Sequence, residues 1–287
     1  MDIGIGIPNT VLDTPGEVFV EWARRAEERG FSTLASIGRI AYPSHDELLA
    51  FAAATGVTER IGFLTNILLA PAYPTATLAK QTATLARLSA GRFTLGAGVG
   101  ARPDDFAIAG APFHDRGRRF DEQLEALHAV WRGDPIPGSG AHVAPPAPNG
   151  RVPILFAGET RFAAPRAVRW NGGFTIGGAP AEQAAAAAAE FRRGYADLGG
   201  AGSARVVALI YFSLGDEHTE ESLRNLRTYY GHLTDWVEAI AQGAARSPED
   251  LRDRVKAYED AGIDELILDP SVAILDQVDR AADVVFG

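Results

Sequence analysis

The sequence predicts an α/β fold, and a closed (β/α)8 or TIM barrel accounts for it best. Eight short apolar segments alternate with longer helical patterns, and the alternation continues to the end of the chain. Strand-then-helix units of this kind imply parallel strands joined by right-handed crossovers. An open doubly wound sheet would also satisfy the alternation, but eight such units in 287 residues fit a closed barrel better. No change in composition marks a boundary, so we expect residues 1–287 to form a single domain.

Strands are expected where short apolar runs occur, and helices where apolar residues recur every three or four positions. The predicted strands are residues 3–8, 31–37, 61–69, 92–97, 152–157, 173–176, 205–212 and 265–269. The predicted helices are residues 17–29, 46–55, 75–88, 116–132, 161–170, 180–198, 220–242, 248–261 and 275–285. Glycines that commonly end helices follow three of these segments, at positions 30, 91 and 262.

One segment, residues 134–151, interrupts the alternation. It contains five prolines and three glycines, so it cannot form a core element. It follows the fourth long helix and precedes the fifth strand. We therefore expect an inserted loop or short hairpin at the helix-to-strand end of the barrel, or a loop folded across one face that helps to shape a substrate pocket.

Composition excludes several classes of function. The net charge of −10 argues against nucleic acid or an anionic membrane as the main partner. The chain has no cysteine, which excludes disulfides, thiolate catalysis and cysteine-based metal sites. Its six histidines show no metal-ligand spacing, and no G-x-S-x-G nucleophile motif occurs. No apolar run reaches the ~18 residues of a membrane span, and the chain begins directly with a strand, so a cytoplasmic protein is expected.

Three alternating glycines, Gly96, Gly98 and Gly100, end the fourth predicted strand. The dinucleotide-binding fingerprint requires G-x-G-x-x-G and a helix that starts within it. Ala101 and Pro103 stand where a third glycine would complete that pattern, and Pro103 argues against a helix directly after the turn. The glycines lie at the strand ends where barrel enzymes carry their chemistry. They either let a ligand approach the backbone or relieve crowding in the barrel interior.

Two long segments carry a resemblance to a known family. TERIGFLTNILLAPAYPTATLAKQTATLARLSAGRFTLGAGVG and PDDFAIAGAPFHDRGRRFDEQLEALHAVWRG resemble the bacterial luciferase-like family of flavin-dependent oxidoreductases. The match is strong over residues 46–133 and looser in IGIGIP, VPILFAGETRFAAPRAVRWNGG and AGIDELIL. The resemblance implies a (β/α)8 barrel that binds reduced FMN, or in a related branch a 5-deazaflavin coenzyme, at its C-terminal face. It also implies a homodimer, which the alanine- and leucine-rich second and third helices would suit.

The resemblance assigns cofactor-binding roles to residues at four strand ends. Thr65 and Asn66 would lie beside the ring, although both could be ordinary polar residues at the end of a strand. Residues 98–102 would lie under the cofactor side chain, with Arg102 near the phosphate or, alternatively, exposed on a surface loop. The candidates from these segments and from the two following turns are Thr65, Asn66, Gly98, Gly100, Arg102, Gly158, Thr160, Gly177 and Gly178.

Glu159 departs from the family pattern, which has a small neutral residue at the start of this helix. A carboxylate beside a phosphate is repulsive unless Arg161 or Arg102 offsets it, or it only caps the helix. We therefore expect the phosphate to be held mainly from the neighbouring turn, where Gly177 and Gly178 precede a proline at the first helical position.

The candidate catalytic residues are Arg39, His45 and His114. Family members with monooxygenase activity often carry a histidine just after the second strand, where this chain has Arg39. Arg39 could contact an acidic substrate or form a salt bridge. His45 could turn toward the cofactor, but with Asp46 it also fits a helix cap, and His114 fits an exposed loop.

The leading hypothesis is a monooxygenase that uses reduced FMN and O2 on a small organic substrate. A separate flavin reductase would then supply the electrons. The first alternative is a hydride-transferring oxidoreductase that uses the deazaflavin coenzyme, and the second is a non-catalytic flavin-binding barrel. Glu159 and the missing histidine favour the last of these.

Overall fold

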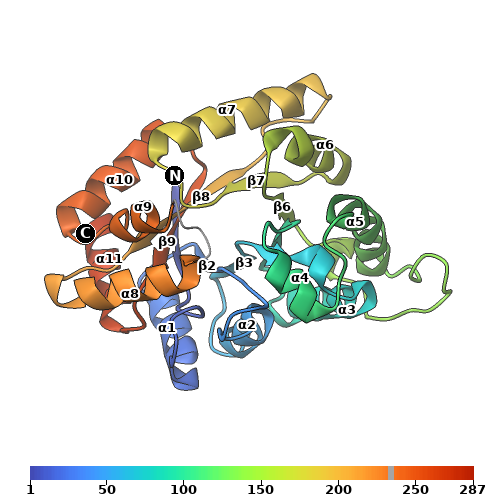
Figure 1. Ribbon diagram of the computed structural model, residues 1–287. Coiled ribbons are helices and arrows are strands. Elements are labelled where there is room, and N and C mark those ends of the chain that lie inside the picture. Colours follow the sequence, from blue (N-terminus) through green and yellow to red (C-terminus); the bar gives the residue numbers. More distant parts are fainter. Residues whose placement is uncertain (232–235) are drawn as a thin grey trace.

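Eight parallel strand positions form a closed barrel (Figure 1). The structure is a computed structural model that describes residues 1–231 and 236–287. The strands are β1 (Asp2–Gly6), β2 (Thr33–Ser36), β3 (Gly62–Thr65), β4 (Leu68–Leu69), β5 (Phe93–Gly98), β6 (Ile154–Phe156), β7 (Gly173–Ile176), β8 (Val206–Phe212) and β9 (Glu265–Pro270). Their order is β3-β2-β1-β9-β8-β7-β6-β5-β4, and β3 also pairs with β5. This last pairing closes the ring, so the barrel prediction is confirmed over the open sheet.

The strand predicted at residues 61–69 is divided in two. β3 pairs with β2 and β5, and after a cis peptide between Asn66 and Ile67 the chain resumes as β4 beside the end of β5. β4 therefore extends the same strand position toward the C-terminal end of the barrel. The 3-10 turn η1 (Ala70–Ala72) follows it directly.

The helices surround the ring and largely match the predicted segments. They are α1 (Gly16–Glu28), α2 (Glu47–Thr55), α3 (Thr75–Leu88), α4 (Pro103–Ala109), α5 (Arg116–Arg132), α6 (Thr160–Trp170), α7 (Ala181–Asp197), α8 (Thr219–Tyr230), α9 (Val237–Gln242), α10 (Pro248–Asp260) and α11 (Asp276–Val285). The helix predicted at residues 220–242 corresponds to α8 and α9, and residues 232–235 with His232 lie outside the described residues. No helix in the described part of the chain is long and apolar enough to cross a membrane.

Helix α4 corrects the expectation for Pro103. The proline was expected to prevent a helix directly after the glycine turn, but it occupies the first turn of α4. A proline is tolerated there because the backbone N–H that it lacks would have no partner within the helix. The helix begins after the glycines and not within them, which excludes a dinucleotide-binding turn of the Rossmann type.

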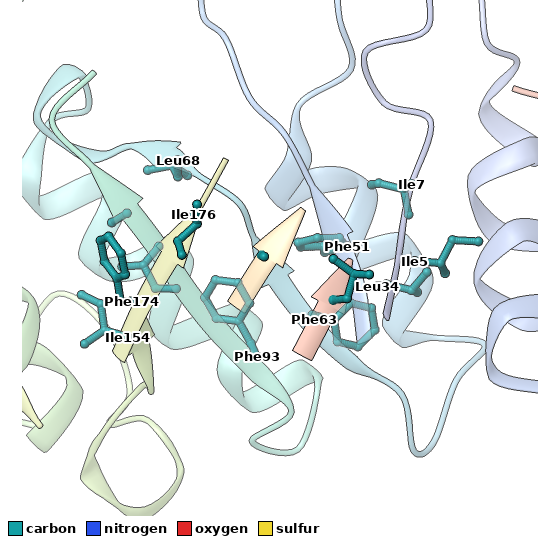
Figure 2. Packing of buried hydrophobic residues seen from close by; sticks show 14 of the residues in the cluster. Ile5, Ile7, Leu34, Phe51, Phe63, Leu68, Phe93, Ile154, Phe174 and Ile176 are labelled. Carbon is teal, nitrogen blue, oxygen red and sulfur yellow. The ribbon is translucent and has the colours of Figure 1, made fainter. Parts of the chain in front are cut away.

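The main core lies between the outer face of the barrel and the helices. Figure 2 shows Phe51 of α2 beside Leu34 of β2 and Phe63 of β3, and the rings of Phe51 and Phe63 lie 5.4 Å apart. Between α5 and α3, the Trp131 indole nitrogen donates to the Thr82 hydroxyl at 3.0 Å. Burying a side chain of this size contributes about 1.5–3 kcal/mol, so this layer fixes the positions of the strand ends that carry the site.

The proline-rich loop, residues 134–151, connects α5 to β6 and therefore lies at the N-terminal end of the barrel. Within it, the Ile136 amide donates to the Ala141 carbonyl at 2.9 Å, and Arg87 of α3 donates to the Pro146 carbonyl at 3.1 Å. In Figure 1 it is the green loop that projects beyond α5 and α3. The expectation that it could help to shape the substrate pocket is wrong, because strand ends and loop lie at opposite ends of the barrel.

Candidate functional site

Two connected cavities open at the C-terminal ends of β5, β6 and β7. The larger has a volume of about 760 Å³ and lies between the end of β5, the start of α5 and the turn that leads from β6 into α6. The smaller, of about 480 Å³, extends from the same β6 turn along β7 toward α7. The shared wall consists of Ala157, Gly158 and Glu159. We call the larger one the main cavity and the smaller one the side cavity.

Glycines form much of the main cavity surface. Gly98 and Gly100 line it from β5, and a Cβ on Gly98 would overlap the Ile67 side chain, which also lines it. Gly158 has φ +109°, and open space lies where its Cβ would point. By contrast, a Cβ on Gly96 would overlap the Thr65 carbonyl oxygen. Gly96 therefore relieves crowding in the barrel wall. Gly98 and Gly100 line the main cavity, but a Cβ on either would press against the side chain of Ile67 or Leu69.

A polar bridge crosses the barrel beneath these cavities. The Thr175 hydroxyl of β7 donates to the Asn66 side-chain oxygen at 2.5 Å, which leaves the Asn66 amide nitrogen buried and without a hydrogen-bond partner. Such unpaired buried donors are uncommon. Thr65 is fully buried, and its hydroxyl donates to the Gly96 carbonyl at 2.9 Å inside the barrel wall. Of the two residues, only Asn66 retains an unused donor.

Three arginines surround the main cavity: Arg116 and Arg118 in the first turn of α5, and Arg166 of α6. Arg116 donates to the Gly100 carbonyl at 2.8 Å, which ties the helix start to the glycine segment. Arg166 makes a two-bonded ion pair with Asp121, at 2.7 and 3.1 Å. Guanidinium groups beside the starts of two helices favour an anion, and the carboxylates of Asp121 and Glu159 line the same cavity. These arginines were not identified from the sequence, although Arg116 and Arg118 lie in the arginine-rich segment DRGRR at a helix start.

The turn before α6 compensates its own negative charge. Glu159 accepts an ion pair from Arg161 at 2.7 Å, so Arg161 offsets the carboxylate that departs from the family pattern. The Thr160 hydroxyl donates to Glu190 of α7 across the side cavity. Gly177 also lines the side cavity, whereas Gly178 faces the Tyr211 ring, to which its Cβ would be 3.5 Å.

Arg102 and Arg39 point to the other side of the barrel mouth. The Arg102 guanidinium lies over the rings of Tyr229 and Tyr230, at 5.1 and 5.7 Å. Arg39 forms an ion pair with Asp104 at 2.6 Å and is 7% exposed. Both arginines therefore connect loops at the mouth, and neither is among the residues that line the two cavities.

The two candidate histidines are exposed and lie away from the cavities. The His45 ring packs edge-on against Phe19 of α1 at 4.7 Å. The next residue, Asp46, caps α2 by accepting the Leu49 amide at 2.8 Å. His114 contacts only its neighbour Phe113 among the ring contacts of the described residues. The geometry thus favours a capping segment at His45 and a surface loop at His114.

Other titratable groups are buried away from the two cavities, and the acids among them were not identified from the sequence. Asp269 at the end of β9 is fully buried, and this burial raises its pKa well above the usual range. Burial raises the pKa of Glu47, at the start of α2, to about 8. The hydroxyls of Tyr211 and Tyr230 lie 2.5 Å apart. Across the residues that the structure describes, no three acidic or histidine side chains gather in a way that could hold a metal ion.

The sequence matches a family model and a curated relative. The family model for luciferase-like monooxygenases matches residues 1–268. An uncharacterized protein of Mycobacterium tuberculosis is 32% identical over 192 residues, covering 57% of this chain and 67% of the relative.

Two solved structures with low sequence identity share the fold. An F420-dependent secondary alcohol dehydrogenase in complex with an F420-acetone adduct has a TM-score of 0.80 at 18% identity, covering 99% of this chain and 98% of the other. The oxygenating constituent of 3,6-diketocamphane monooxygenase from Pseudomonas putida, in complex with FMN, has a TM-score of 0.78 at 15% identity, covering 99% and 97%.

Proposed function

The chain belongs to the luciferase-like monooxygenase family, and from this premise we propose that it is an oxidoreductase with a flavin-type cofactor in the main cavity. One observation carries the proposal. The main cavity combines glycine backbone from β5 with two helix starts and three arginines. A flat ring requires a surface without side chains, and a phosphate requires N–H groups and guanidinium groups. Both requirements are met within one cavity of about 760 Å³.

The residues present fit such a cofactor. Gly98 and Gly100 would lie against the ring. The sequence favours a phosphate held mainly at Gly177 and Gly178, but neither glycine lines the main cavity. We therefore place the phosphate between the starts of α5 and α6, where Arg118 and Arg166 supply positive charge. When bound, the cofactor supplies two-electron chemistry, and the protein orients it and excludes water.

We further propose that the cofactor is reduced FMN and that O2 and a small organic substrate are the co-reactants. The family description and the FMN complex of the Pseudomonas putida monooxygenase support this choice. A separate flavin reductase would supply the electrons, because every described strand belongs to the one barrel. The catalytic roles of Arg39, His45 and His114 stay predictions.

A deazaflavin coenzyme is the second candidate. Arg118 and Arg161 are 66% and 70% exposed at the openings of the two cavities. A cofactor whose anionic tail continues past the phosphate could meet them there. The fold shared with the F420-dependent secondary alcohol dehydrogenase is compatible with this alternative.

Fluorescence titration of the cofactor-free protein with FMN and with the deazaflavin coenzyme tests the proposal. We expect one of them to bind with a micromolar or lower Kd and Arg166→Gln to weaken it about a hundredfold, since charged hydrogen bonds contribute about 1.5–3 kcal/mol. Arg169→Gln is the matched control, because Arg169 lies on the same helix but pairs with Glu125 outside the main cavity. Binding of neither cofactor contradicts the proposal, and binding without O2 consumption or hydride transfer indicates a non-catalytic barrel.

We also propose that the protein is a homodimer formed through α2 and α3. Leu49 of α2 is 70% exposed and Leu88 of α3 is 56% exposed, so both helices present apolar surface to solvent. Light scattering tests this, because the chain mass is 30.5 kDa. A particle of twice that mass is expected, and a particle of the chain mass contradicts the dimer.

A further inference from the structure

Two asparagines in this chain are each followed by glycine, in the pairs Asn149–Gly150 and Asn171–Gly172. The backbone nitrogen of the next residue can attack an asparagine side chain, and this attack is least hindered when that residue has no side chain of its own. The other three asparagines precede threonine, isoleucine or leucine. The two Asn–Gly pairs are therefore the positions where the backbone could most easily modify an asparagine.

The first pair lies in an open turn. This turn is η2 (Pro148–Gly150), at the end of the proline-rich loop. Asn149 is exposed and has φ +56°. A Cβ on Gly150 would make only an ordinary 3.7 Å contact with the backbone of Arg132, so the Gly150 backbone is not tightly enclosed. Its amide donates to the Ala147 carbonyl at 3.0 Å. Exposed turns of this kind open at a low free-energy cost.

The second pair lies in a rigid connection between α6 and β7. Asn171 ends α6 at φ +49°, and the Gly172 amide donates to the Ala167 carbonyl at 2.9 Å. A Cβ on Gly172 would lie 2.8 Å from the Phe156 ring and 2.9 Å from the Ile154 carbonyl oxygen, so the Gly172 backbone is tightly enclosed. The Gly172 nitrogen can approach the Asn171 side chain only if this part of the core opens, which costs more free energy than opening an exposed turn.

Both pairs border the same positively charged cavity. Gly150 and Asn171 line a cavity of about 280 Å³ at the N-terminal end of the barrel, which we call the base cavity. Arg132, Arg151 and Arg169 also line it, and among the described residues no carboxylate does. Two of these arginines pair with exposed carboxylates outside it. A negative charge formed beside the base cavity therefore meets no repulsion from its lining. The two pairs differ in backbone restraint and not in this favourable charge.

We propose that Asn149 is a site of spontaneous deamidation in the folded protein and that Asn171 is protected from it. The Gly150 backbone nitrogen loses its proton and forms a bond to Cγ of Asn149. The bond from Cγ to the side-chain nitrogen breaks, and ammonia leaves. Water then hydrolyses the resulting cyclic imide at either carbonyl, which leaves aspartate or isoaspartate at position 149. The reaction needs only water, so this proposal does not depend on the proposed function.

Mass spectrometry of tryptic peptides tests the proposal, because the two pairs fall in different peptides, residues 133–151 and 170–192. The protein is incubated at mildly alkaline pH in water enriched in oxygen-18, either folded or unfolded in guanidinium chloride. In the unfolded chain we expect similar rates at Asn149 and Asn171, since both precede glycine. In the folded protein we expect Asn149 to react at least tenfold faster, with one oxygen-18 atom incorporated. Equal rates in the folded protein, or reaction of Asn149 only after unfolding, overturn the proposal.

A matched pair of variants separates the chemistry of the pair from strain in the loop. Gly150→Ala adds a methyl group next to the reacting nitrogen, and we expect it to slow deamidation of Asn149 at least tenfold. Gly138→Ala is the control, because Gly138 lies in the same loop at φ +80° with open surroundings, whereas Gly150 has φ +67°. Both substitutions place a side chain at a positive φ, but Gly138→Ala should keep the parent rate. An unchanged rate in Gly150→Ala, or an equal fall in both variants, overturns the proposal.

Discussion

The two halves of the barrel mouth differ in what their strand ends carry. Around β5 and β6 the strand ends carry glycines, and the side chains that line the main cavity include three arginines. Around β8 and β9 the inward positions carry Tyr211 and Asp269, and Tyr229 of α8 packs over them, so little space remains. The strands have the same direction and the same geometry in both halves. Side-chain size at the strand ends therefore decides which half is open and which half is filled.

The largest effect is expected from a bulky residue in the wall shared by the two cavities. Gly158→Val places a branched side chain at φ +109° and directs it into open space, so cofactor affinity should fall at least a hundredfold. Gly138→Val is the control, because Gly138 has φ +80° and open surroundings in the proline-rich loop. Fluorescence titration and urea unfolding of both variants separate backbone strain from loss of binding. Equal cofactor affinities in the two variants would contradict the role of the open half.

The next effect concerns pH and Glu47, a buried acid at the start of α2 that lines neither of the two cavities. Burial raises the pKa of Glu47 to about 8 from its usual value of 4.5, so between these two values the folded state keeps a proton that the unfolded state has lost. The contribution of Glu47 to the free energy of unfolding should therefore be greatest below pH ~4.5. It should fall as the pH rises to about 8, by at most ~1.4 kcal/mol per pH unit. Urea unfolding at several pH values across this range should show that the free energy of unfolding depends less on pH in Glu47→Gln than in the parent protein. Glu28→Gln, at an exposed position, should keep the pH dependence of the parent protein. The same pH dependence in all three proteins would show that Glu47 is ionised in the folded state.

A smaller effect is expected at the floor of the main cavity. A methyl group on Gly98 would overlap the end of the Ile67 side chain, which must then turn into the cavity. We expect Gly98→Ala to weaken cofactor binding about tenfold, or ~1.4 kcal/mol. Gly178→Ala should change it less than twofold, since its Cβ would make an ordinary 3.5 Å contact with Tyr211. If both substitutions have the same effect on Kd, the ring does not lie over the end of β5.

The smallest effect on binding is expected in the filled half. Tyr211→Phe removes one member of the hydroxyl pair with Tyr230. It should lower the free energy of unfolding by about 1–2 kcal/mol, the typical effect of breaking a buried hydrogen bond. Cofactor affinity should stay within twofold of the parent value. A large loss of affinity, measured by the same titration, would assign the filled half a direct part in binding.

The fold could be predicted from the sequence because the patterns that indicate it are local and repeat along the chain. Eight strand positions and most helix boundaries follow from the period of apolar residues and from terminal glycines. The exceptions have local causes. Pro103 was interpreted as a barrier although it fits the first turn of α4, and the strand at residues 61–69 is divided at Asn66.

The site was less predictable, because it depends on contacts between distant segments. Gly98, Gly100 and Gly158 could be identified at strand ends, and the structure places all three on the main cavity. Arg166 was not identified, because only the folded barrel brings α6 beside the start of α5. Arg102 was assigned to the phosphate from its position in the chain, but its side chain lies over the tyrosines of α8.

The proline-rich loop has a practical consequence for handling the protein. It is exposed over most of its length and leaves the barrel at the end remote from both cavities. Exposed loop tips of this kind tolerate insertions well. An affinity tag or fluorophore inserted near Ser139 would anchor the molecule to a support with its mouth turned toward solution, where small molecules can enter and leave unhindered.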